Sequence, residues 1–361
     1  MKAIKQMMVG LILTVPLMGS ALAVTITIGK GSGIVWEGLP YNETLSGSMV
    51  SEMMDPVFGL LSVSYSPIAC MDNSKLQTIG GYLAYPLGNT GVGLIPRATG
   101  TATYVRRNGD KESLTGSIGL PDTKGVSSTG ENVTSLSVRS WCLPPSMTKN
   151  DYFYNKTAIR TATLSGTWVM VADGTQQNAQ VTVPPMFFGS YSSDGNGDRK
   201  VPILPSNITL RISSLECSVN TPTTINFNSV GRNTQTGAEL ASISLPLNTT
   251  CGQPNDQINA NINLQFRALT GIYEGVPSRL ALTQGGGYIT GEIDNGVTGS
   301  GLCNATTGLP FDNTQLKVGS ITSAESSKSL TNQVTWRLCS GGSNLPSGKV
   351  DASAEMLVTF N

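Results

Sequence analysis

The stretch Val350-Asp-Ala-Ser-Ala-Glu-Met-Leu-Val-Thr-Phe-Asn361 carries an apolar side chain at every even position. Those positions are Val350, Ala352, Ala354, Met356, Val358 and Phe360. Successive residues of a β-strand point to opposite faces, so this period of two predicts a strand with one buried face and one wet face. A strand that ends a chain has no following hairpin partner, so its free edge must be paired by an earlier strand or by another polypeptide. The sequence therefore leaves two alternatives: a sandwich closed by its own last strand, and one completed by a donated strand.

The first residues have the three parts of a secretory signal peptide. Lys2 and Lys5 precede an apolar run to Leu17, and the small residues of Ala21-Leu22-Ala23 follow. We therefore expect 1–23 to be a signal peptide and the mature chain to start at Val24. Removal of 23 of the 361 residues leaves 338, which favours two domains. No other apolar run approaches the roughly 20 residues of a membrane helix, so we expect an exported, soluble product.

Charge and composition narrow the classes of function. Removal of Lys2 and Lys5 from the 23 basic residues leaves 21, against 23 acidic residues. A nearly neutral chain provides no field for a polyanion, so nucleic acid is not expected as a partner. The sequence contains no histidine, which removes the usual general base, a common metal ligand and the serine or cysteine protease triads. We expect no enzyme and no cofactor, although glycoside hydrolysis by two carboxylates needs no histidine and stays an alternative.

Six cysteines in an exported chain predict disulfides. Six cysteines permit 15 arrangements, and pairing of neighbours follows from the assumption that each bridge stays within one domain. None has the CxxC spacing of a structural zinc site, and no metal is expected. The expected bridges are Cys70 with Cys142, Cys217 with Cys251, and Cys303 with Cys339.

From Val24 onward, short alternating or apolar runs are separated by clusters of Gly, Pro, Ser and Asn, and no stretch has a sustained helical period. This pattern predicts an all-β protein. Lys200-Val-Pro-Ile-Leu-Pro205 resembles a linker because its two prolines cannot lie inside a central strand. We therefore expect two β-sandwich domains, at 24–203 and 204–361. The expected strands are 24–28, 60–65, 101–106, 133–141, 159–171 and 180–183 in the first domain, and 207–212, 225–227, 241–247, 258–268, 279–282, 314–321, 334–338 and 350–360 in the second.

Three features of the second half together resemble the pilin domain of chaperone–usher fimbriae. They are Gly348 at the 14th position from the C-terminus, the penultimate aromatic Phe360, and a cysteine after an opening strand followed by another some thirty residues later, Cys217 and Cys251. The resemblance covers 207–361, and Cys303 with Cys339 is outside the minimal family pattern. It implies an incomplete immunoglobulin-like sandwich whose last strand, from Gly348 through Val350 to Phe360, contacts a periplasmic chaperone and then flanks a groove filled by the next subunit.

About 180 residues precede the pilin-like part, an arrangement similar to that of a two-domain fimbrial tip adhesin. The resemblance implies a periplasmic chaperone, an outer-membrane usher and a strand-donating pilus subunit as partners. It also implies export to the fimbrial tip and a host glycan or glycolipid as the receptor. A non-adhesive minor pilus subunit is the alternative within the same class. Val24-Thr-Ile-Thr-Ile28 could be a donor extension, but we expect it in the first domain's sheet because Cys217 lies so far along the chain.

Aromatic and basic residues of the first half are the candidates for ligand binding. Sugars stack on aromatic rings and bond to polar side chains, and Asp151-Tyr-Phe-Tyr-Asn-Lys156 offers both kinds of group. Three consecutive aromatics of an extended segment cannot all face one core, so we expect at least one to face outward. The adjacent basic pairs suit a carboxylate or sulfate on an acidic glycan. The candidates are Arg106, Arg107, Trp141, Tyr152, Tyr154, Arg199 and Lys200.

Each of these candidates has a structural alternative. The aromatic run would equally serve as a loop that covers the end of the domain, and the basic pairs as solvated surface. Asp194-Gly-Asn-Gly-Asp198 has the first three ligand positions of a calcium loop. Position six is Arg199 and position twelve is Pro205, where such a loop needs Gly and Glu. Calcium is therefore not expected.

Overall fold

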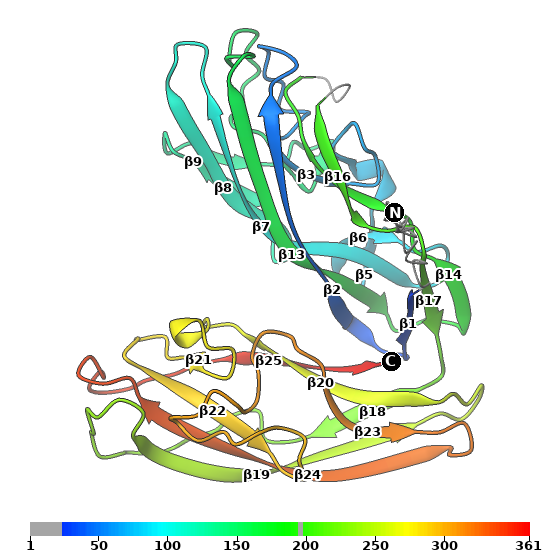
Figure 1. Ribbon diagram of the computed structural model, residues 1–361. Coiled ribbons are helices and arrows are strands. Elements are labelled where there is room, and N and C mark those ends of the chain that lie inside the picture. Colours follow the sequence, from blue (N-terminus) through cyan, green and yellow to red (C-terminus); the bar gives the residue numbers. More distant parts are fainter. Residues whose placement is uncertain (1–23, 194–197) are drawn as a thin grey trace, which may run out of the picture.

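The computed structural model describes residues 24–193 and 198–361, and these residues form an all-β protein, as the sequence predicted. The regular elements described are strands, apart from two single-turn 3-10 helices at Asn73–Lys75 and Tyr273–Gly275. Figure 1 shows two lobes that meet near β1 (Val24–Ile28) and the C-terminal end of β25 (Ala354–Phe360). The expected signal peptide and residues 194–197 of the calcium-like loop lie outside the described residues.

The first lobe is built on an eight-stranded sheet with three long neighbouring strands at one side, β7, β13 and the edge strand β2. β2, β7 and β13 contain 17, 14 and 15 residues, against about 5 or 6 in a typical strand. The strand order is β10-β9-β8-β7-β13-β2, and β6 attaches β5 to β7. In chain order the strands are β2 (Ser32–Ser48), β5 (Gln77–Ile79), β6 (Tyr82–Pro86), β7 (Val92–Val105), β8 (Lys111–Gly119), β9 (Lys124–Ser127), β10 (Asn132–Thr134) and β13 (Ile159–Asp173).

Two smaller sheets complete the first lobe, and the first hydrophobic core contains residues of both as well as of the large sheet. One has the order β12-β3-β15-β16 and the other pairs β11 with β4. The large side chain of Trp168 is fully buried in this core, and its indole N–H donates to the Ile203 carbonyl. The strands are β3 (Leu61–Ser64), β4 (Met71–Asp72), β11 (Arg139–Ser140), β12 (Cys142–Leu143), β15 (Met186–Ser190) and β16 (Arg199–Leu204).

A six-stranded sheet contains strands from both halves of the chain, in the order β14-β17-β1-β25-β20-β23. β1 pairs in parallel with β17 over five residues, and Thr27 of β1 also pairs with Phe360 of β25. β1 belongs to the first lobe as expected, because it pairs with β17 and its Ile26 and Ile28 are buried in the first core, but its sheet also continues into the second lobe through β25. The other strands are β14 (Ala179–Thr182), β17 (Ile208–Ile212), β20 (Ala260–Ala268) and β23 (Leu316–Ile321).

In the second lobe, two layers of strands face each other. One is the β25-β20-β23 part of the six-stranded sheet, and the other is a five-stranded sheet of order β18-β19-β24-β22-β21. The second core cluster lies between them and includes Phe266 of β20 and Val334 of β24. The third cluster, around Leu215 and Phe360, fills the end of this lobe nearest the first. The strands are β18 (Glu216–Asn220), β19 (Glu239–Gly252), β21 (Leu280–Ala281), β22 (Gly287–Ile293) and β24 (Ser327–Ser340).

Several predicted strands differ from the observed ones. The predicted strand at 225–227 is not part of any sheet, and the one at 133–141 is two short strands, β10 and β11. β2, the longest strand, was not predicted because Gly33, Gly38 and Pro40 interrupt its pattern. The prediction of one wet face for 258–268 is wrong, since Asn263 and Gln265 are buried. The Gln265 side-chain amide donates to the Glu37 carbonyl, which lies in the first half of the chain.

All three predicted disulfides are confirmed: Cys70–Cys142, Cys217–Cys251 and Cys303–Cys339. Cys217 and Cys251 are direct cross-strand partners on β18 and β19. Each bridge joins segments of the same lobe. The Cys251 side chain is buried in the third cluster.

The first core extends beyond the expected boundary at 203/204. Ile208, Leu210 and Ile212 of β17 are at most 2% exposed and belong to this core. β17 also pairs with β1 and with β14. We therefore place the boundary between the proposed domains after Ser213, whose N–H donates to the Ile28 carbonyl.

This boundary predicts that a fragment of residues 24–213 folds as a cooperative monomer and that a fragment of residues 24–203 does not. Burial of three Ile or Leu side chains contributes roughly 5 to 9 kcal/mol, which is comparable to the whole stability of a domain. The measurement is thermal unfolding of both fragments after expression into an oxidising compartment. Equal melting temperatures would return the boundary to 203/204.

Candidate functional site

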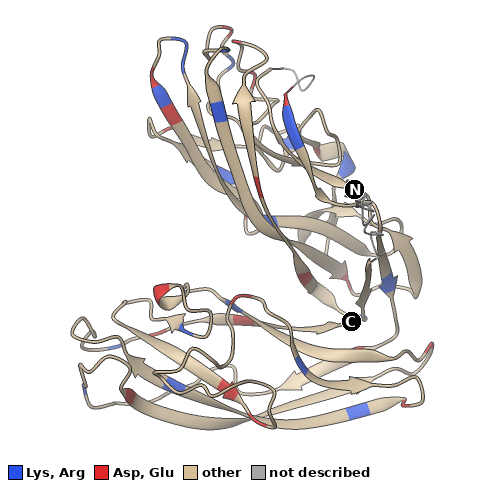
Figure 2. Cartoon of the chain, in the orientation of Figure 1, with Lys and Arg blue, Asp and Glu red and all other residues tan. Residues whose placement is uncertain are grey.

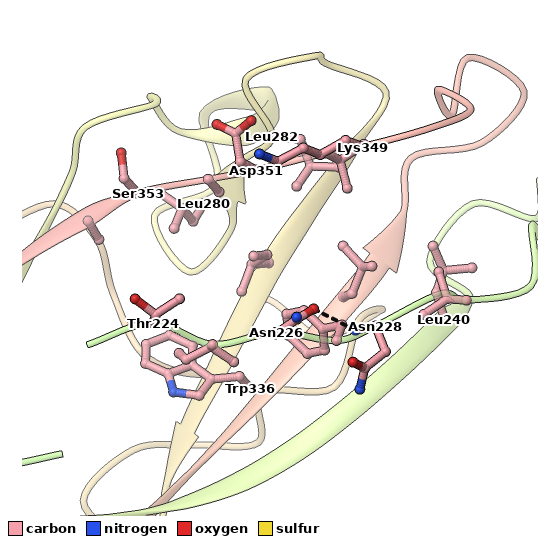
Figure 3. A pocket seen from close by; sticks show the side chains of 18 of the residues that line it. Thr224, Asn226, Asn228, Leu240, Leu280, Leu282, Trp336, Lys349, Asp351 and Ser353 are labelled. Atoms are coloured by element: carbon pink, nitrogen blue, oxygen red, sulfur yellow. Dashed lines mark hydrogen bonds between the residues drawn. The ribbon is translucent and has the colours of Figure 1, made fainter. Parts of the chain in front are cut away.

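The second lobe contains an apolar groove of about 1240 Å³. Its two rims are the segments 221–232 and 345–356. Figure 3 shows Thr224, Asn226 and Asn228 on the first rim and Lys349, Asp351 and Ser353 on the second. The lining side chains Trp336 and Leu280 lie near the first and the second rim, respectively. Pockets for small ligands measure ~300 to 1,000 Å³, so this groove has room for a larger occupant. Side chains from β19, β20, β21, β22 and β24 line it, among them Leu247, Phe266, Leu280, Ile289, Val334, Trp336 and Leu338.

The β25 rim presents an unpaired backbone edge to the groove. β25 pairs with β20 in antiparallel register, from Ala354 opposite Ala268 to Phe360 opposite Ile262. Asn361 and Asn261 exchange both backbone hydrogen bonds at the end of this ladder. Bonding alternates along an antiparallel pair, so the odd residues of β25 bond to β20 and the even residues direct their N–H and C=O groups away from it. At Ala354, Met356 and Val358, the described residues supply no strand on that side.

The opposite rim is an extended segment that no strand pairs. Beyond Asn220, the last paired residue of β18, residues 221–230 make no backbone-to-backbone hydrogen bond within the described parts of the chain. Ile225, Phe227 and Val230 are half-buried and line the groove. Two extended segments with apolar side chains therefore face each other across a hollow, and neither has a partner on the facing side.

The start of the β25 rim is held in place by a turn. The Asp351 carboxylate accepts from the Thr283 hydroxyl and from the Gln284 side-chain amide, each at 2.8 Å. The Asp351 carbonyl also accepts from the Thr283 N–H. These side-chain bonds, helped by the nearby charge of Lys349, lower the pKa of the Asp351 carboxyl below its usual value. The rim is thus fixed on its outer side while its inner edge stays open.

The structure locates the seven residues expected to contact a chaperone or donated strand. Gly348, Val350, Ala352, Ala354 and Met356 line the groove. Gly348 has φ of 95°, a conformation that favours glycine, although a Cβ there would meet no atom. Val358 is half-buried beyond the groove, and Phe360 is 7% exposed in the third cluster. Phe360 therefore lies past the closed end of the groove and is not one of its lining residues.

A second group of candidates meets at the end of the first lobe that is remote from the second. The Arg107 N–H donates to the Phe153 carbonyl, which joins the loop after β7 to the aromatic run. The Arg107 guanidinium lies 4.5 Å from the centre of the Tyr152 ring and 2.7 Å from a carboxylate oxygen of Glu52. The Arg106 guanidinium lies 3.8 Å from the centre of the Phe153 ring. Tyr152 is 68% exposed, so one aromatic of the run faces outward as predicted. We call Glu52, Arg107 and Tyr152 the distal cluster.

Two predicted ligand-binding residues are buried and cannot stack on a ligand in this conformation. Tyr154 is fully buried against Tyr104 and Phe153, and its desolvation raises the pKa of its hydroxyl well above the usual value. Trp141 is 3% exposed and lies in the first core. These two side chains pack in the hydrophobic core of the first lobe.

The remaining basic candidates, Arg199 and Lys200, are exposed on β16. Figure 2 shows basic residues at this end of the lobe on several strands and loops. A Cβ at Gly47 would collide with the Arg199 guanidinium, so the glycine leaves room for it. Among the described residues, no ion pair or ring contact joins Arg199 or Lys200 to the distal cluster.

Sequence reasoning missed the buried ion pair beneath these loops. Arg160 and Asp198 are 3.0 Å apart, and their side chains are 1% and 0% exposed. The second carboxylate oxygen of Asp198 accepts from the N–H and hydroxyl of Ser192. Both carboxylate oxygens of Asp198 therefore already have partners, Arg160 and Ser192. No signal in the sequence separated Asp198 from the calcium-like spacing around it.

The described residues contain no cluster of three or more acidic or cysteine side chains that could hold a metal ion. In the same residues, no helix has the length and apolar character that crossing a membrane requires.

Comparisons with known proteins give two weak structural likenesses. No protein-family model matches the chain, and no curated protein matches it. A chain from a chaperone–tip adhesin complex of CFA/I fimbriae biogenesis is 10% identical, with 93% of this chain and 95% of that chain covered and a TM-score of 0.23. The CupB6 tip adhesin from Pseudomonas aeruginosa is 11% identical, with 92% and 88% covered and the same TM-score. A TM-score this low does not establish a shared fold.

The buried pair predicts very different costs for two adjacent substitutions. Asp198→Ala leaves the Arg160 charge buried and unpaired, at a cost of ~3 to 5 kcal/mol of unfolding free energy. Arg199→Ala, the matched control at an exposed position, should change it by no more than ~0.5 kcal/mol. The measurement is urea unfolding followed by tryptophan fluorescence, since Trp36, Trp141 and Trp168 all lie in the first lobe. Similar costs for the two variants would contradict this account of Asp198.

Proposed function

We propose that this chain is a fimbrial subunit of the tip-adhesin type. Its second lobe accepts an extended strand from a partner protein, and its first lobe attaches to a host glycan or glycolipid. One observation carries the proposal: the edge of β25 and the segment 221–230 face each other unpaired across an apolar groove. An inserted strand would bond to the N–H and C=O groups of this edge while its apolar side chains fill the groove.

The energetics explain why such a subunit would need partners throughout its assembly. Each buried donor or acceptor without a hydrogen-bond partner costs ~1 to 3 kcal/mol of folding stability, and the edge of β25 presents several such groups. A periplasmic chaperone would supply the strand first and the adjacent pilus subunit later, at an outer-membrane usher. Gly348, Val350, Ala352, Ala354 and Met356 are the residues that this exchange would contact.

The position of β1 supports an acceptor role over a donor role. β1 has the alternating pattern of a donor extension, but it is paired with β17 in its own chain. Ile26 and Ile28 are buried in the first core. A strand held in this way cannot be given to a neighbour without opening that core. This observation favours a subunit at the end of a fibre over a minor subunit within it.

The distal cluster is the proposed receptor site. The Tyr152 ring is exposed for stacking, and Arg107 places a guanidinium beside it. A guanidinium can bond to the carboxylate or sulfate of an acidic glycan through two parallel hydrogen bonds. Part of that capacity is used by Glu52, which a stronger anionic ligand would have to displace. Arg106, Arg199 and Lys200 would add positive potential around the site.

The strand-acceptor proposal predicts that a peptide fused after Asn361 stabilises the chain. A flexible turn must precede the peptide, because the chain end lies at the closed end of the groove and the peptide has to run back along β25. With apolar residues at alternate positions, it should raise soluble yield and increase the melting temperature of the second lobe by ~10 °C or more. The matched control replaces its apolar residues with Asp. Equal yield and stability of the two fusions would show that β25 needs no added strand.

Two substitutions localise this effect. Met356→Asp places a charge in the groove and should abolish most of the stabilisation by the fused peptide. Ser242→Asp introduces the same charge at an exposed position of β19 and should leave the stabilisation unchanged.

The receptor proposal predicts loss of attachment without loss of stability. Arg107→Ala and Tyr152→Ala should each weaken attachment to immobilised acidic glycans several-fold, and Arg107→Ala should also flatten its salt dependence. Combined substitution of Arg106, Arg199 and Lys200 should weaken it further. Lys124→Ala, an exposed basic residue on β9, is the control. Binding that is independent of salt and of Arg107 would indicate a neutral glycan instead.

A further inference from the structure

β1 closes one end of the groove's free edge. Thr27 pairs with Phe360, the last residue of β25, on the side of the strand that is unpaired at Val358 and before it. An inserted strand and β1 would therefore occupy the same edge of β25 end to end. Neither could pass the other without breaking backbone pairs.

β1 is held firmly in this position. Its five residues pair with β17, and the Ile28 carbonyl accepts from the Ser213 N–H. Ile26, Thr27 and Ile28 are at most 5% exposed. A Cβ on Gly29 would collide with the Leu215 carbonyl oxygen, so the chain after β1 also packs closely on the second lobe. Displacement of β1 would expose part of the first core.

The side-chain space of the groove ends at Met356, one even-numbered position before Val358, the last unpaired residue of the edge. On the β25 rim the lining ends at Met356, and on the other rim it ends at Thr221. Beyond them the third cluster, which includes Leu215, Ile262 and Phe360, fills the lobe. The other end is flanked by Arg232 and Lys349, which stand on opposite rims. The groove thus has one closed end and one flanked by two basic side chains.

These limits define the size of the occupant. The rim from Gly348 to Met356 spans about 26 Å at the ~3.3 Å rise of a strand, which corresponds to about nine residues. Ala352 and Ala354 place only methyl groups on the groove face, whereas Met356 is larger. Large apolar side chains of the occupant would therefore fit beside the two alanines, with a smaller one near the closed end.

We propose that β1 acts as a stop that fixes how far an inserted strand reaches along β25. This inference rests on the proposed strand-acceptor function of the second lobe. The occupant is a single extended segment of a second polypeptide, about nine residues long, with apolar residues at alternate positions. Its leading end lies at Val358 against Thr27, and the rest of its chain leaves between Arg232 and Lys349. The stop sets the register, so alternating peptides of different lengths align at the same leading residue.

The test uses peptides that have no register preference of their own. A repeating Ile-Thr sequence can slip by two residues without changing which side chains face the groove. Peptides of about nine, about 11 and about 13 residues are added to the full-length protein carrying Val358→Cys. Each peptide has one Cys, at its leading end or at an internal position, activated as a thiopyridyl disulfide, so the introduced thiol forms the new disulfide and thiopyridone leaves. Both chain directions are made. All six native cysteines are in disulfides, so the introduced thiol is the only free one.

If β1 is a stop, the terminal Cys of every peptide, whatever its length, should link to the thiol at 358 with the same yield. The leading end would then shift by zero residues as the peptide is lengthened. Extra residues would then project past Arg232 and Lys349. Loss of terminal linkage with length, with an internal Cys linking in its place, would show that peptides run past Phe360 and would overturn the stop. If Val358→Cys does not fold, Leu357→Cys on the other face of β25 gives a second attachment point for peptides whose Cys is moved by one residue to that face.

The failure of the strand-acceptor function would look different. In that case no peptide of any length would link or raise the melting temperature, whereas an Ile-Thr peptide that stabilises the protein but fails to align removes only the stop. A peptide with Asp in place of Ile is the control for non-specific linkage.

Discussion

The unpaired edge of β25 is the constraint on which the second lobe depends. The backbone N–H and C=O groups of its even-numbered residues face an apolar hollow, where water cannot satisfy their hydrogen bonding as well as a strand could. The same residues leave small or half-buried side chains on the groove face, so the hydrophobic and hydrogen-bonding deficits coincide. One inserted strand would correct both deficits together, whereas a small apolar ligand would correct only the first. The chemistry of the groove therefore favours a polypeptide as its occupant.

The two lobes differ in how completely their backbone N–H and C=O groups are hydrogen-bonded within the chain. The first lobe has long strands, and its core includes strands from all parts of residues 24–213. The loops of its distal cluster are joined by backbone hydrogen bonds, because the Arg107 N–H donates to the Phe153 carbonyl and the Phe153 N–H donates to the Glu52 carbonyl. Stability in this lobe leaves loop residues free to contact a ligand. In the second lobe the incomplete part is itself the proposed site.

The sequence predicted the elements whose pattern is local. The all-β class and the three disulfides could be predicted because each depends on spacing along the chain. The strand expected at 350–360 is confirmed in part: β25 begins only at Ala354, and Thr359 on the expected wet face is 1% exposed. The burial of Asn263 and Gln265 could not, since it results from contact with Glu37 of a distant strand. Trp141 and Tyr154 were assigned to the ligand site because residue type alone does not tell a buried aromatic from an exposed one. The failed prediction at 225–227 has a different cause: the segment has the alternation of a strand, but no partner strand pairs it.

The placement of β1 has a mechanical consequence. Figure 1 shows the long strands of the first lobe running from the distal loops toward the junction, where β1 and β25 meet. A pull between a ligand at the proposed receptor site and a strand in the proposed acceptor groove would act along these strands, so their hydrogen bonds would resist it together in shear. At the junction the sheet is continuous through a single residue pair, Thr27 with Phe360, supported by the ion pair of Arg97 with Glu355. Under tension the junction between the lobes would therefore yield before either core, and the molecule could straighten while both lobes stay folded.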